Sequence, residues 1–327
     1  MVADKGGPLL HIEGLKTHFY TDDGIARAVD GVDIKIHRGE TVGIVGESGC
    51  GKTVTAMTVL KLIAMQPGRI VEGRILWQGR DLVPLTSEQL DEIRAKEIAI
   101  VFQEPMTSLN PVYTIGDQLT EVLLRHEGLN RKAARERVLE LLSLVQIANP
   151  QRRIDDYPHQ FSGGMRQRVM IAMALACNPK LLIADEPTTA LDVTIQAQIL
   201  ELMAELKEKF GMAIMLITHA MGVVAEVTQR VVVMYAGKVV EEAPVEALFE
   251  TPRHPYTQGL IRSIPRIDRS ATQRARLEAI GGSVPSILNL PVGCRFADRC
   301  KFAMPECRLA EPPLREVAPG HKVACIL

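Results

Sequence analysis

The sequence predicts an α/β fold with central parallel strands, followed by a smaller loop-rich region. Three continuous apolar runs have the length of strands: Thr41–Val45, Leu181–Ala184 and Ala213–Ile217. Such runs suit a parallel sheet that helices cover on both faces. A Gly-rich turn follows the first run, and Lys52–Met65 then has helical spacing. These observations predict alternating strands and helices over roughly the first 240 residues.

Length and composition exclude several classes of protein. The chain has 327 residues, 46% hydrophobic and 24% charged, with 38 Lys and Arg against 39 Asp and Glu. Because the formal net charge is −1, nucleic acid is not expected as a partner. No apolar run approaches the roughly 18–20 residues that span a bilayer, and the N-terminus has no signal-peptide pattern. We therefore expect a cytoplasmic protein that reaches a membrane only through partners.

A mostly helical insertion separates the first two strand runs, roughly from Pro105 to Tyr157, within a helical subdomain of about residues 105–165. Within it, Arg131–Ile147 has one apolar stripe opposite Arg and Glu, which predicts an amphipathic, solvated helix. The stripe consists of Ala134, Val138, Leu141, Leu142 and Val145.

The Gly-rich turn has the pattern of a phosphate-binding loop. Its residues are Gly46, Glu47, Ser48, Gly49, Cys50, Gly51, Lys52 and Thr53, which match G-x-x-x-x-G-K-[ST] between a strand and a helix. The glycines let backbone N–H groups wrap the β-phosphate at a helix N-terminus. Lys52 can reach the β- and γ-phosphates, and the Thr53 hydroxyl can coordinate Mg²⁺. The pattern and its context predict ATP and Mg²⁺ as ligands.

Two carboxylates follow the second strand run. Asp185 and Glu186 come directly after LLIA. We expect Asp185 to hold Mg²⁺ through its water shell and Glu186 to polarise the attacking water. Acidic residues often simply end a strand, so the pair gains its meaning from the phosphate loop upstream.

A third segment makes the chain recognisable. Phe161-Ser162-Gly163-Gly164-Met165-Arg166-Gln167 resembles the signature motif of ATP-binding-cassette (ABC) ATPases. The remaining motifs of that family follow at similar spacing: Gln103 in IVFQEP, Ala190-Leu191-Asp192 after the carboxylates, and His219 in LITHAM. The resemblance covers essentially the whole chain and implies a RecA-like core with an N-terminal antiparallel β region.

The resemblance also implies roles for single residues. Phe19 would stack on adenine, with neighbouring Tyr20 as an alternative for this role. Phe19 could instead be an ordinary aromatic residue of a strand. Gln103 would sense Mg²⁺ and the attacking water, and His219 would contact the γ-phosphate. The segment that would cap ATP on the opposite subunit contains Ser162, Gly163, Gly164 and Met165. Asp192 would belong to the D-loop. Because that segment acts in trans, the resemblance implies a dimer whose second cassette is another chain.

Two positions differ from the general family pattern. Met165 stands where Gln is frequent, which matches the peptide-importer group. Ala220 stands where Asp usually follows the switch histidine. Either His219 is positioned less firmly and hydrolysis is slower, or the change is tolerated variation.

The last part of the chain narrows the choice of transporter. Arg253-His254-Pro255-Tyr256-Thr257, GCRFADRC and the final Cys325 resemble the extension of peptide and nickel importer ATPases. We divide the chain into an ATPase domain, residues 1–242, and a Pro-rich extension, residues 243–327.

The extension holds four of the six cysteines: Cys294, Cys300, Cys307 and Cys325. Their spacing, C-x5-C-x6-C-x17-C, matches neither zinc knuckles nor common ferredoxins. Basic residues interleave with them and could offset thiolate charge: Arg295, Arg299, Lys301, Arg308 and Lys322. The resemblance favours a [4Fe–4S] cluster over zinc, and free thiols remain the alternative. We expect His321 to be a surface residue rather than a substitute ligand.

The resemblance therefore predicts the ATP-hydrolysing subunit of a bacterial importer for di- or oligopeptides, at the cytoplasmic face of the inner membrane as a peripheral protein. It implies a second, different ATPase subunit, two membrane permeases and an extracytoplasmic solute-binding protein. An importer for nickel or another small solute is the alternative within the group. A soluble ABC ATPase of nucleic-acid repair or translation is the alternative from another class, although such proteins typically have two cassettes or a long coiled coil.

Overall fold

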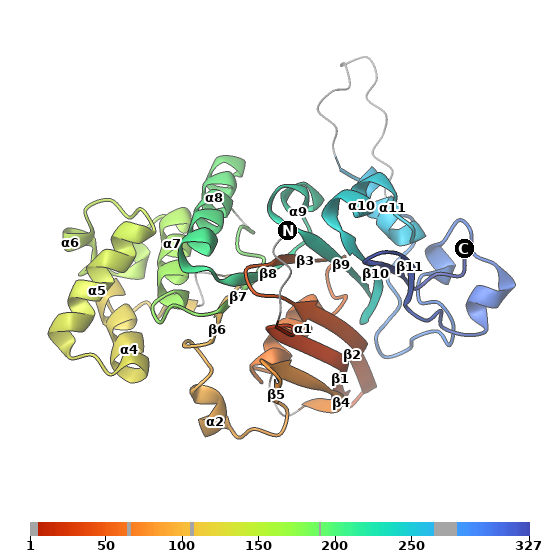
Figure 1. Cartoon of the computed structure of the whole chain (residues 1–327), viewed down its shortest axis with the longest axis horizontal. Helices are drawn as coiled ribbons and strands as arrows, with labels where there is room; N and C mark the ends of the chain where they lie inside the picture. Colours follow the sequence, from red (N-terminus) through yellow and green to blue (C-terminus); the bar gives the residue numbers. More distant parts are fainter. Residues whose placement is uncertain (1–5, 64–66, 105–107, 190, 265–279) are drawn as a thin grey trace, which may run out of the picture. The chain divides into compact units, whose positions relative to one another are not determined.

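The computed structural model describes residues 6–63, 67–104, 108–189, 191–264 and 280–327 (Figure 1). The chain forms two compact units. Most of the first unit is Pro84–Ile217, and the second consists of Gly7–Ile36, Thr41–Val83 and Thr218–Leu327. Ala190, the start of the insertion at Pro105 and the expected helix end at Met65 lie outside the described residues.

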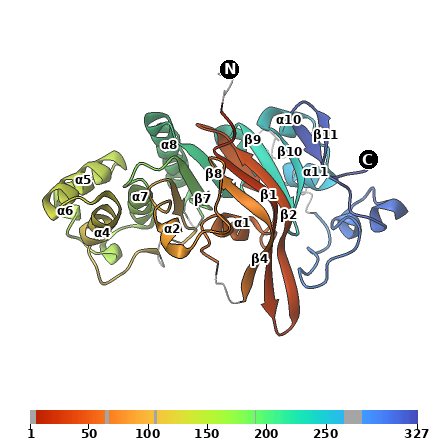
Figure 2. The same ribbon diagram turned by 60° about the horizontal axis from the view of Figure 1, so that its bottom comes forward.

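An antiparallel sheet forms the N-terminal part of the second unit. Its strand order is β2-β1-β4-β5, and Figure 2 shows the first three strands side by side. The strands are β1 (Leu10–Thr21), β2 (Gly24–Ile36), β4 (Gly68–Trp77) and β5 (Arg80–Asp81). Apolar side chains alternate with polar ones along β1, as expected for a sheet with one covered face. The predicted N-terminal antiparallel β region is confirmed.

A second group of strands follows the order β3-β9-β10-β12-β11 within the same unit. β3 (Thr41–Val45) and β9 (Arg230–Tyr235) are parallel, whereas β10 (Lys238–Pro244), β12 (His321–Val323) and β11 (Arg315–Ala318) pair antiparallel. The helices of the unit are α1 (Lys52–Val59), α9 (Met221–Val227), α10 (Val245–Glu250), α11 (Pro255–Arg262), η3 (Ala297–Arg299) and η4 (Pro305–Arg308). Helix α1 is shorter than predicted, because the chain leaves helical geometry at Leu60 and Lys61 has a left-handed φ of 50°.

One apolar core joins the C-terminal residues to these strands. Tyr235 at the end of β9, Tyr256 in α11 and Phe296 are all buried, with ring centroids 4.7–5.4 Å apart. The boundary expected at residues 242 and 243 falls inside β10, with the same compact unit on both sides. The division into an ATPase domain and an extension therefore stays a prediction about functional modules.

The first unit contains three parallel strands in the order β6-β7-β8. They are β6 (Ile98–Val101), β7 (Leu181–Asp185) and β8 (Ala213–Thr218). The helices are α2 (Ser87–Asp91), α4 (Ile115–Glu127), α5 (Arg131–Leu144), α6 (Pro150–Arg153), η1 (Pro158–Gln160), α7 (Gly163–Ala174) and α8 (Val193–Phe210). All residues of β7 and β8 are buried, as the continuous apolar runs predicted.

The predicted amphipathic helix is confirmed as α5. Its apolar stripe is fully buried, and Asn130 begins the helix by accepting a hydrogen bond from the Ala133 N–H. Buried Arg168 of α7 donates to the Val145 carbonyl at 3.0 Å, which satisfies a carbonyl at the C-terminal end of α5. Helices α4, α5 and α7 therefore form one packed group.

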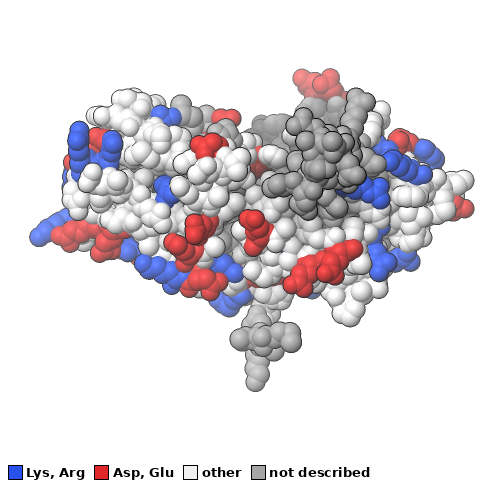
Figure 3. Space-filling view, turned by 90° about the horizontal axis from the view of Figure 1, so that it is seen from above, with Lys and Arg blue, Asp and Glu red and all other residues white. Residues whose placement is uncertain are grey.

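Among the described residues, no helix combines the length and apolar character needed to cross a membrane. On the face shown in Figure 3, basic and acidic side chains are interspersed, in keeping with 38 basic and 39 acidic residues in the chain.

Candidate active site

The phosphate-loop motif lies where β3 ends and α1 begins. Lys52, the first residue of α1, is only 5% exposed. Its ammonium group donates to the carbonyl oxygens of Gly46 at 2.8 Å and Glu47 at 3.0 Å. Ser48 and Gly49, at the tip of the loop, are exposed. The loop thus folds around the lysine side chain and presents its tip outward.

The outer glycines of the loop are required by close backbone approaches. A Cβ at Gly46 would lie 2.2 Å from the Met234 carbonyl oxygen, and one at Gly51 would lie 2.4 Å from that of Ala28. Both residues also have positive φ, 153° and 101°. No L side chain fits there without displacing a neighbouring strand.

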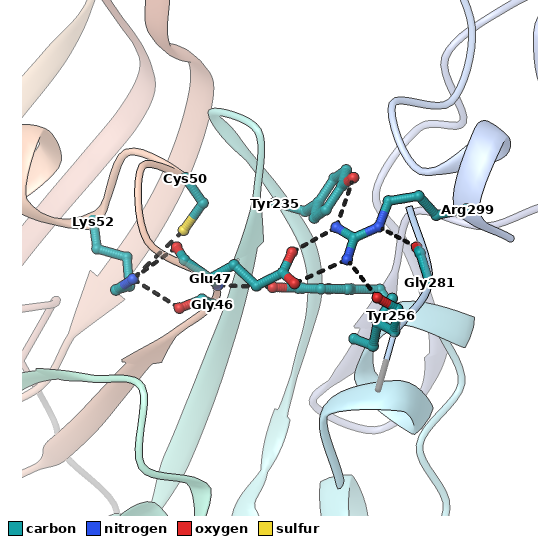
Figure 4. Close-up of polar contacts among 9 residues, drawn as sticks. Gly46, Glu47, Cys50, Lys52, Tyr235, Tyr256, Gly281 and Arg299 are labelled. Carbon is teal, nitrogen blue, oxygen red and sulfur yellow. Dashed lines mark hydrogen bonds and ion pairs between the residues drawn. The ribbon is translucent and has the colours of Figure 1, made fainter. Parts of the chain in front are cut away.

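Glu47 is held by residues from the C-terminal part of the chain (Figure 4). Arg299 donates to its two carboxylate oxygens at 2.6 and 2.9 Å. The Tyr256 hydroxyl accepts a hydrogen bond from the Glu47 N–H at 2.8 Å. Sequence reasoning assigned these two residues no role in the loop, because more than 200 residues separate each of them from Glu47.

The two carboxylates predicted for hydrolysis occupy the carboxyl end of β7. Asp185 is 2% exposed, a location that suits a cation-binding carboxylate only with a positive partner nearby. Glu186 accepts hydrogen bonds from the Gln103 amide at 3.0 Å and the Thr189 hydroxyl at 2.8 Å. The structure therefore brings Gln103 and Glu186 together, whereas Thr189 was not singled out from the sequence.

The backbone of Glu186 has an uncommon geometry. Its φ is 48°, in the left-handed region, which few residues other than glycine adopt. The Glu186 N–H donates to the Ile217 carbonyl of β8 at 2.9 Å. That hydrogen bond fixes the turn after β7, so the direction of the carboxylate is set by the parallel strands.

The signature segment and the D-loop both begin helices. Ser162 accepts a hydrogen bond from the Met165 N–H at the start of α7, and Asp192 accepts one from the Ile195 N–H at the start of α8. A Cβ at Gly164 would lie 2.7 Å from a methyl carbon of Ile195. The close approach of Gly164 to Ile195 shows that the two helix N-termini lie near one another, and Ser162 and Gly163 are exposed.

His219 lies exposed between β8 and α9. Ala220 precedes α9 and supplies no side-chain cap; its N–H donates to the Thr218 hydroxyl at 3.0 Å. In β1, Phe19 is half-buried, whereas Tyr20 is 42% exposed with the Arg69 guanidinium 5.2 Å from its ring centre.

The four-cysteine metal site is not supported by the structure. Among the described residues, which include all four cysteines, no three His, Cys, Asp or Glu side chains are grouped to hold a metal ion. The [4Fe–4S] cluster, with zinc as its alternative, therefore stays a prediction that the described residues do not support.

The basic residues near the cysteines have carboxylate partners instead. Arg295 pairs with Asp30, Arg299 with Glu47, Arg308 with Asp298 and Lys322 with Glu242. The structure does not support the expectation that these four offset thiolate charge, because each of them already has a carboxylate partner.

The expectation that His321 is a surface residue is also wrong. It is 2% exposed, and its Nε2 lies 2.7 Å from a carboxylate oxygen of Glu241. Glu241 is fully buried and also accepts hydrogen bonds from the N–H groups of Arg253 and His254, at 2.7 and 2.9 Å. The sequence signal of this network was the pair of adjacent glutamates, Glu241 and Glu242, inside the strand KVVEEAP.

Comparison with known proteins places these motifs in context. A family model described as "ABC transporter" matches residues 29–189, and one described as "Oligopeptide/dipeptide transporter, C-terminal region" matches residues 240–307. The oligopeptide transport ATP-binding protein AppD of Bacillus subtilis is 53% identical over 98% of this chain and 96% of its own length. The dipeptide transport ATP-binding protein DppD of the same organism is 49% identical over 98% of this chain and 94% of its own length.

Solved structures resemble a large part of the chain. A dimeric ATP-binding cassette bound to ADP and phosphate is 28% identical, with a TM-score of 0.65 over 72% of this chain and 98% of that one. The protein cbiO1 of Clostridium perfringens, part of an ABC transporter complex, is 27% identical, with a TM-score of 0.64 over 75% of this chain and 92% of that one.

Proposed function

This chain is an ATPase of the ABC transporter family, in the group with the oligopeptide/dipeptide transporter C-terminal region, and we propose that it powers the import of di- or oligopeptides. The observation that carries the proposal is the full-length similarity, at 53% identity, to a transport ATP-binding protein named for oligopeptides. The match to the peptide-transporter region argues against a soluble ABC ATPase of repair or translation.

The phosphate loop supplies the binding half of the chemistry. The backbone N–H groups of residues 46–53 would surround the β-phosphate, and the Lys52 ammonium would exchange its two carbonyl partners for phosphate oxygens. Phe19 would stack on the adenine ring; Tyr20, the alternative, has the Arg69 guanidinium 5.2 Å from its ring centre.

The carboxylates after β7 supply the hydrolytic half. Glu186 would orient and deprotonate the attacking water, with its own carboxylate aligned by Gln103 and Thr189. Thr53, Gln103 and Asp185 would hold Mg²⁺, completed by phosphate oxygens and water. When bound, Mg²⁺ neutralises charge on the phosphates. His219 would contact the γ-phosphate.

The signature and D-loop segments favour a dimer of cassettes. The exposed helix N-terminus at Ser162 and Gly163 presents N–H groups and a positive dipole end, which suits the γ-phosphate of ATP on an opposite subunit. Gly164, Met165 and Asp192 would complete that face. A solved cassette of similar fold is dimeric.

We propose that the second cassette is a different ATPase subunit, and that two permeases and an extracytoplasmic solute-binding protein complete the importer. On this proposal the chain is a peripheral protein at the cytoplasmic face of the bacterial inner membrane. Co-purification of the tagged chain from membranes tests the assembly. Recovery of two permeases and a second ATPase is expected; a chain found only free of membranes would contradict it.

Hydrolysis is tested with E186Q, which keeps the size of the side chain but removes the base. ATP binding should persist while phosphate release falls at least about a hundredfold, the usual contribution of a general base. The matched control is E208Q, an exposed carboxylate of α8 that is 81% exposed, which should keep wild-type activity. In cells that lack the wild-type gene, E208Q should restore uptake of a labelled peptide, and E186Q should not. Equal phosphate release by the two variants would contradict the role of Glu186.

A further inference from the structure

Two residues of the C-terminal part of the chain, Arg299 and Tyr256, bind the phosphate loop at Glu47. Arg299 binds both of its carboxylate oxygens, and the Tyr256 hydroxyl binds its N–H (Figure 4). Its carbonyl oxygen accepts from the Lys52 ammonium at 3.0 Å. All the polar groups of Glu47 are thus engaged, two of them by residues from outside the loop.

The Arg299 side chain is itself rigidly placed. It is 4% exposed and lies at the end of η3, with its guanidinium 5.7 Å from the ring centre of Tyr235 and 5.9 Å from that of Phe296. It also donates to the Gly281 carbonyl at 2.9 Å and to the Tyr235 hydroxyl at 3.2 Å. The Glu47 carboxylate raises its pKa above the usual range. A two-pronged pair with a buried arginine is both strong and directional.

Tyr256 is equally fixed. It is fully buried, and its ring packs against those of Tyr235 and Phe296 at 4.7 and 5.4 Å. The hydroxyl is therefore held by the apolar core and not by a surface side chain. A hydrogen bond to a group that cannot move restrains the loop more than one to a mobile side chain.

From this geometry we infer that Arg299 and Tyr256 are positioning residues for the phosphate loop, through which the C-terminal extension sets the affinity for ATP. The inference rests on the proposed role of residues 46–53 in ATP binding. Arg299 and Tyr256 contact Glu47 and leave the loop tip, Ser48 and Gly49, exposed for the phosphates. Because the Glu47 carbonyl also binds Lys52, fixing Glu47 fixes the position from which the ammonium moves to phosphate. A pre-ordered loop loses less conformational entropy when the nucleotide binds.

Three single variants of the full chain test these contacts with Glu47. R299M removes the guanidinium, E47Q removes the carboxylate charge, and Y256F removes the tyrosine hydroxyl. We expect a Kd for a fluorescent ATP analogue with Mg²⁺ that is about tenfold higher in R299M and about three- to fivefold higher in E47Q and Y256F. The KM for ATP should rise in parallel, while kcat changes less than about threefold, because the carboxylates of hydrolysis are untouched. R299K, which keeps the charge but not the two-pronged pair, should fall between wild type and R299M.

The matched control is R308M, since Arg308 also lies in the extension but pairs with Asp298 on the surface. The double variant E47Q/R299M should bind nucleotide no more weakly than R299M alone, because both changes break one pair. If R299M does not fold, Y256F and E47Q, which keep side-chain size, carry the test.

The inference is overturned if the nucleotide affinities of Y256F and E47Q equal that of R308M, or if the effects in the double variant are fully additive. A lowered Tm without a change in Kd also overturns it, because the contacts would then support only stability. Failure of the proposed function has a different signature, namely no binding by wild type or no loss of binding in K52A.

Discussion

The buried histidine at the start of α11 should make folding sensitive to mild acid. His254 is 1% exposed, and its Nδ1 accepts a hydrogen bond from the Tyr256 N–H at 3.1 Å, which requires the neutral ring. Burial lowers the pKa of His254 to about 4 from its usual 6.5. The variant H254N keeps an acceptor at this helix N-terminus but does not titrate.

The sign and size follow from linkage. The unfolded chain binds a proton at this histidine below about pH 6.5, whereas the folded chain does so only near pH 4. The stability from the neutral ring is therefore complete above pH 6.5 and is lost as the pH falls from 6.5 towards 4. Between pH 7.5 and pH 5.0 these two pKa values correspond to a loss of about 2 kcal/mol in the free energy of unfolding.

The assay is urea denaturation of wild type and H254N at both pH values, followed by tryptophan fluorescence and circular dichroism. H254N should start less stable at pH 7.5, through lost packing on Phe296, but should lose about 2 kcal/mol less than wild type on acidification. H159N, in an exposed histidine, serves as the control and should follow wild type. Equal losses in wild type and H254N would refute the reasoning.

Three further variants test other features by the same denaturation assay. E241Q should lower the free energy of unfolding by about 3 kcal/mol, because a neutral amide leaves a buried N–H group without its acceptor; a change no larger than that of D298N, in an exposed pair, would contradict this. G51A should cost about 2 kcal/mol or more and abolish nucleotide binding, since φ is 101° and the new Cβ meets the Ala28 carbonyl; unchanged binding would contradict the fit. A220D should add about 1 kcal/mol by capping α9; an unchanged or lower value would show that the aspartate does not cap.

Much of the fold follows from local signals. β3, β7 and β8 appear within one residue of the apolar runs that predicted them, because a fully buried strand needs apolar side chains on both faces. The amphipathic stripe placed α5 for the same reason. The end of α1 was missed, since no glycine or proline marks Leu60 and the helix ends through the local backbone at Lys61.

The extension was harder to interpret because its contacts are long-range. Interleaved arginines and cysteines suggested a thiolate cluster, yet Arg295 and Arg299 reach Asp30 and Glu47, both near the start of the chain. From local spacing alone, an arginine that neutralises a nearby cysteine thiolate looks the same as one that pairs with a carboxylate in a distant segment. The burial of Glu241 and His321 also depends on a long-range contact, because the pairing of β12 with β10 shields both side chains from water.

Residues that take part in the reaction are easier to identify from a sequence than residues that only position them. Lys52 and Glu186 sit in short patterns because reaction chemistry needs particular groups at fixed spacing on one strand and turn. Arg299 and Tyr256 act on the same loop through geometry alone, and geometry can be supplied from any point of the chain. Residues that set the strength of nucleotide binding therefore lie partly outside the motifs. In this chain Arg299 and Tyr256 fall within residues 240–307, which match the model of an oligopeptide/dipeptide transporter C-terminal region and not the ABC transporter model that covers the motif residues up to 189.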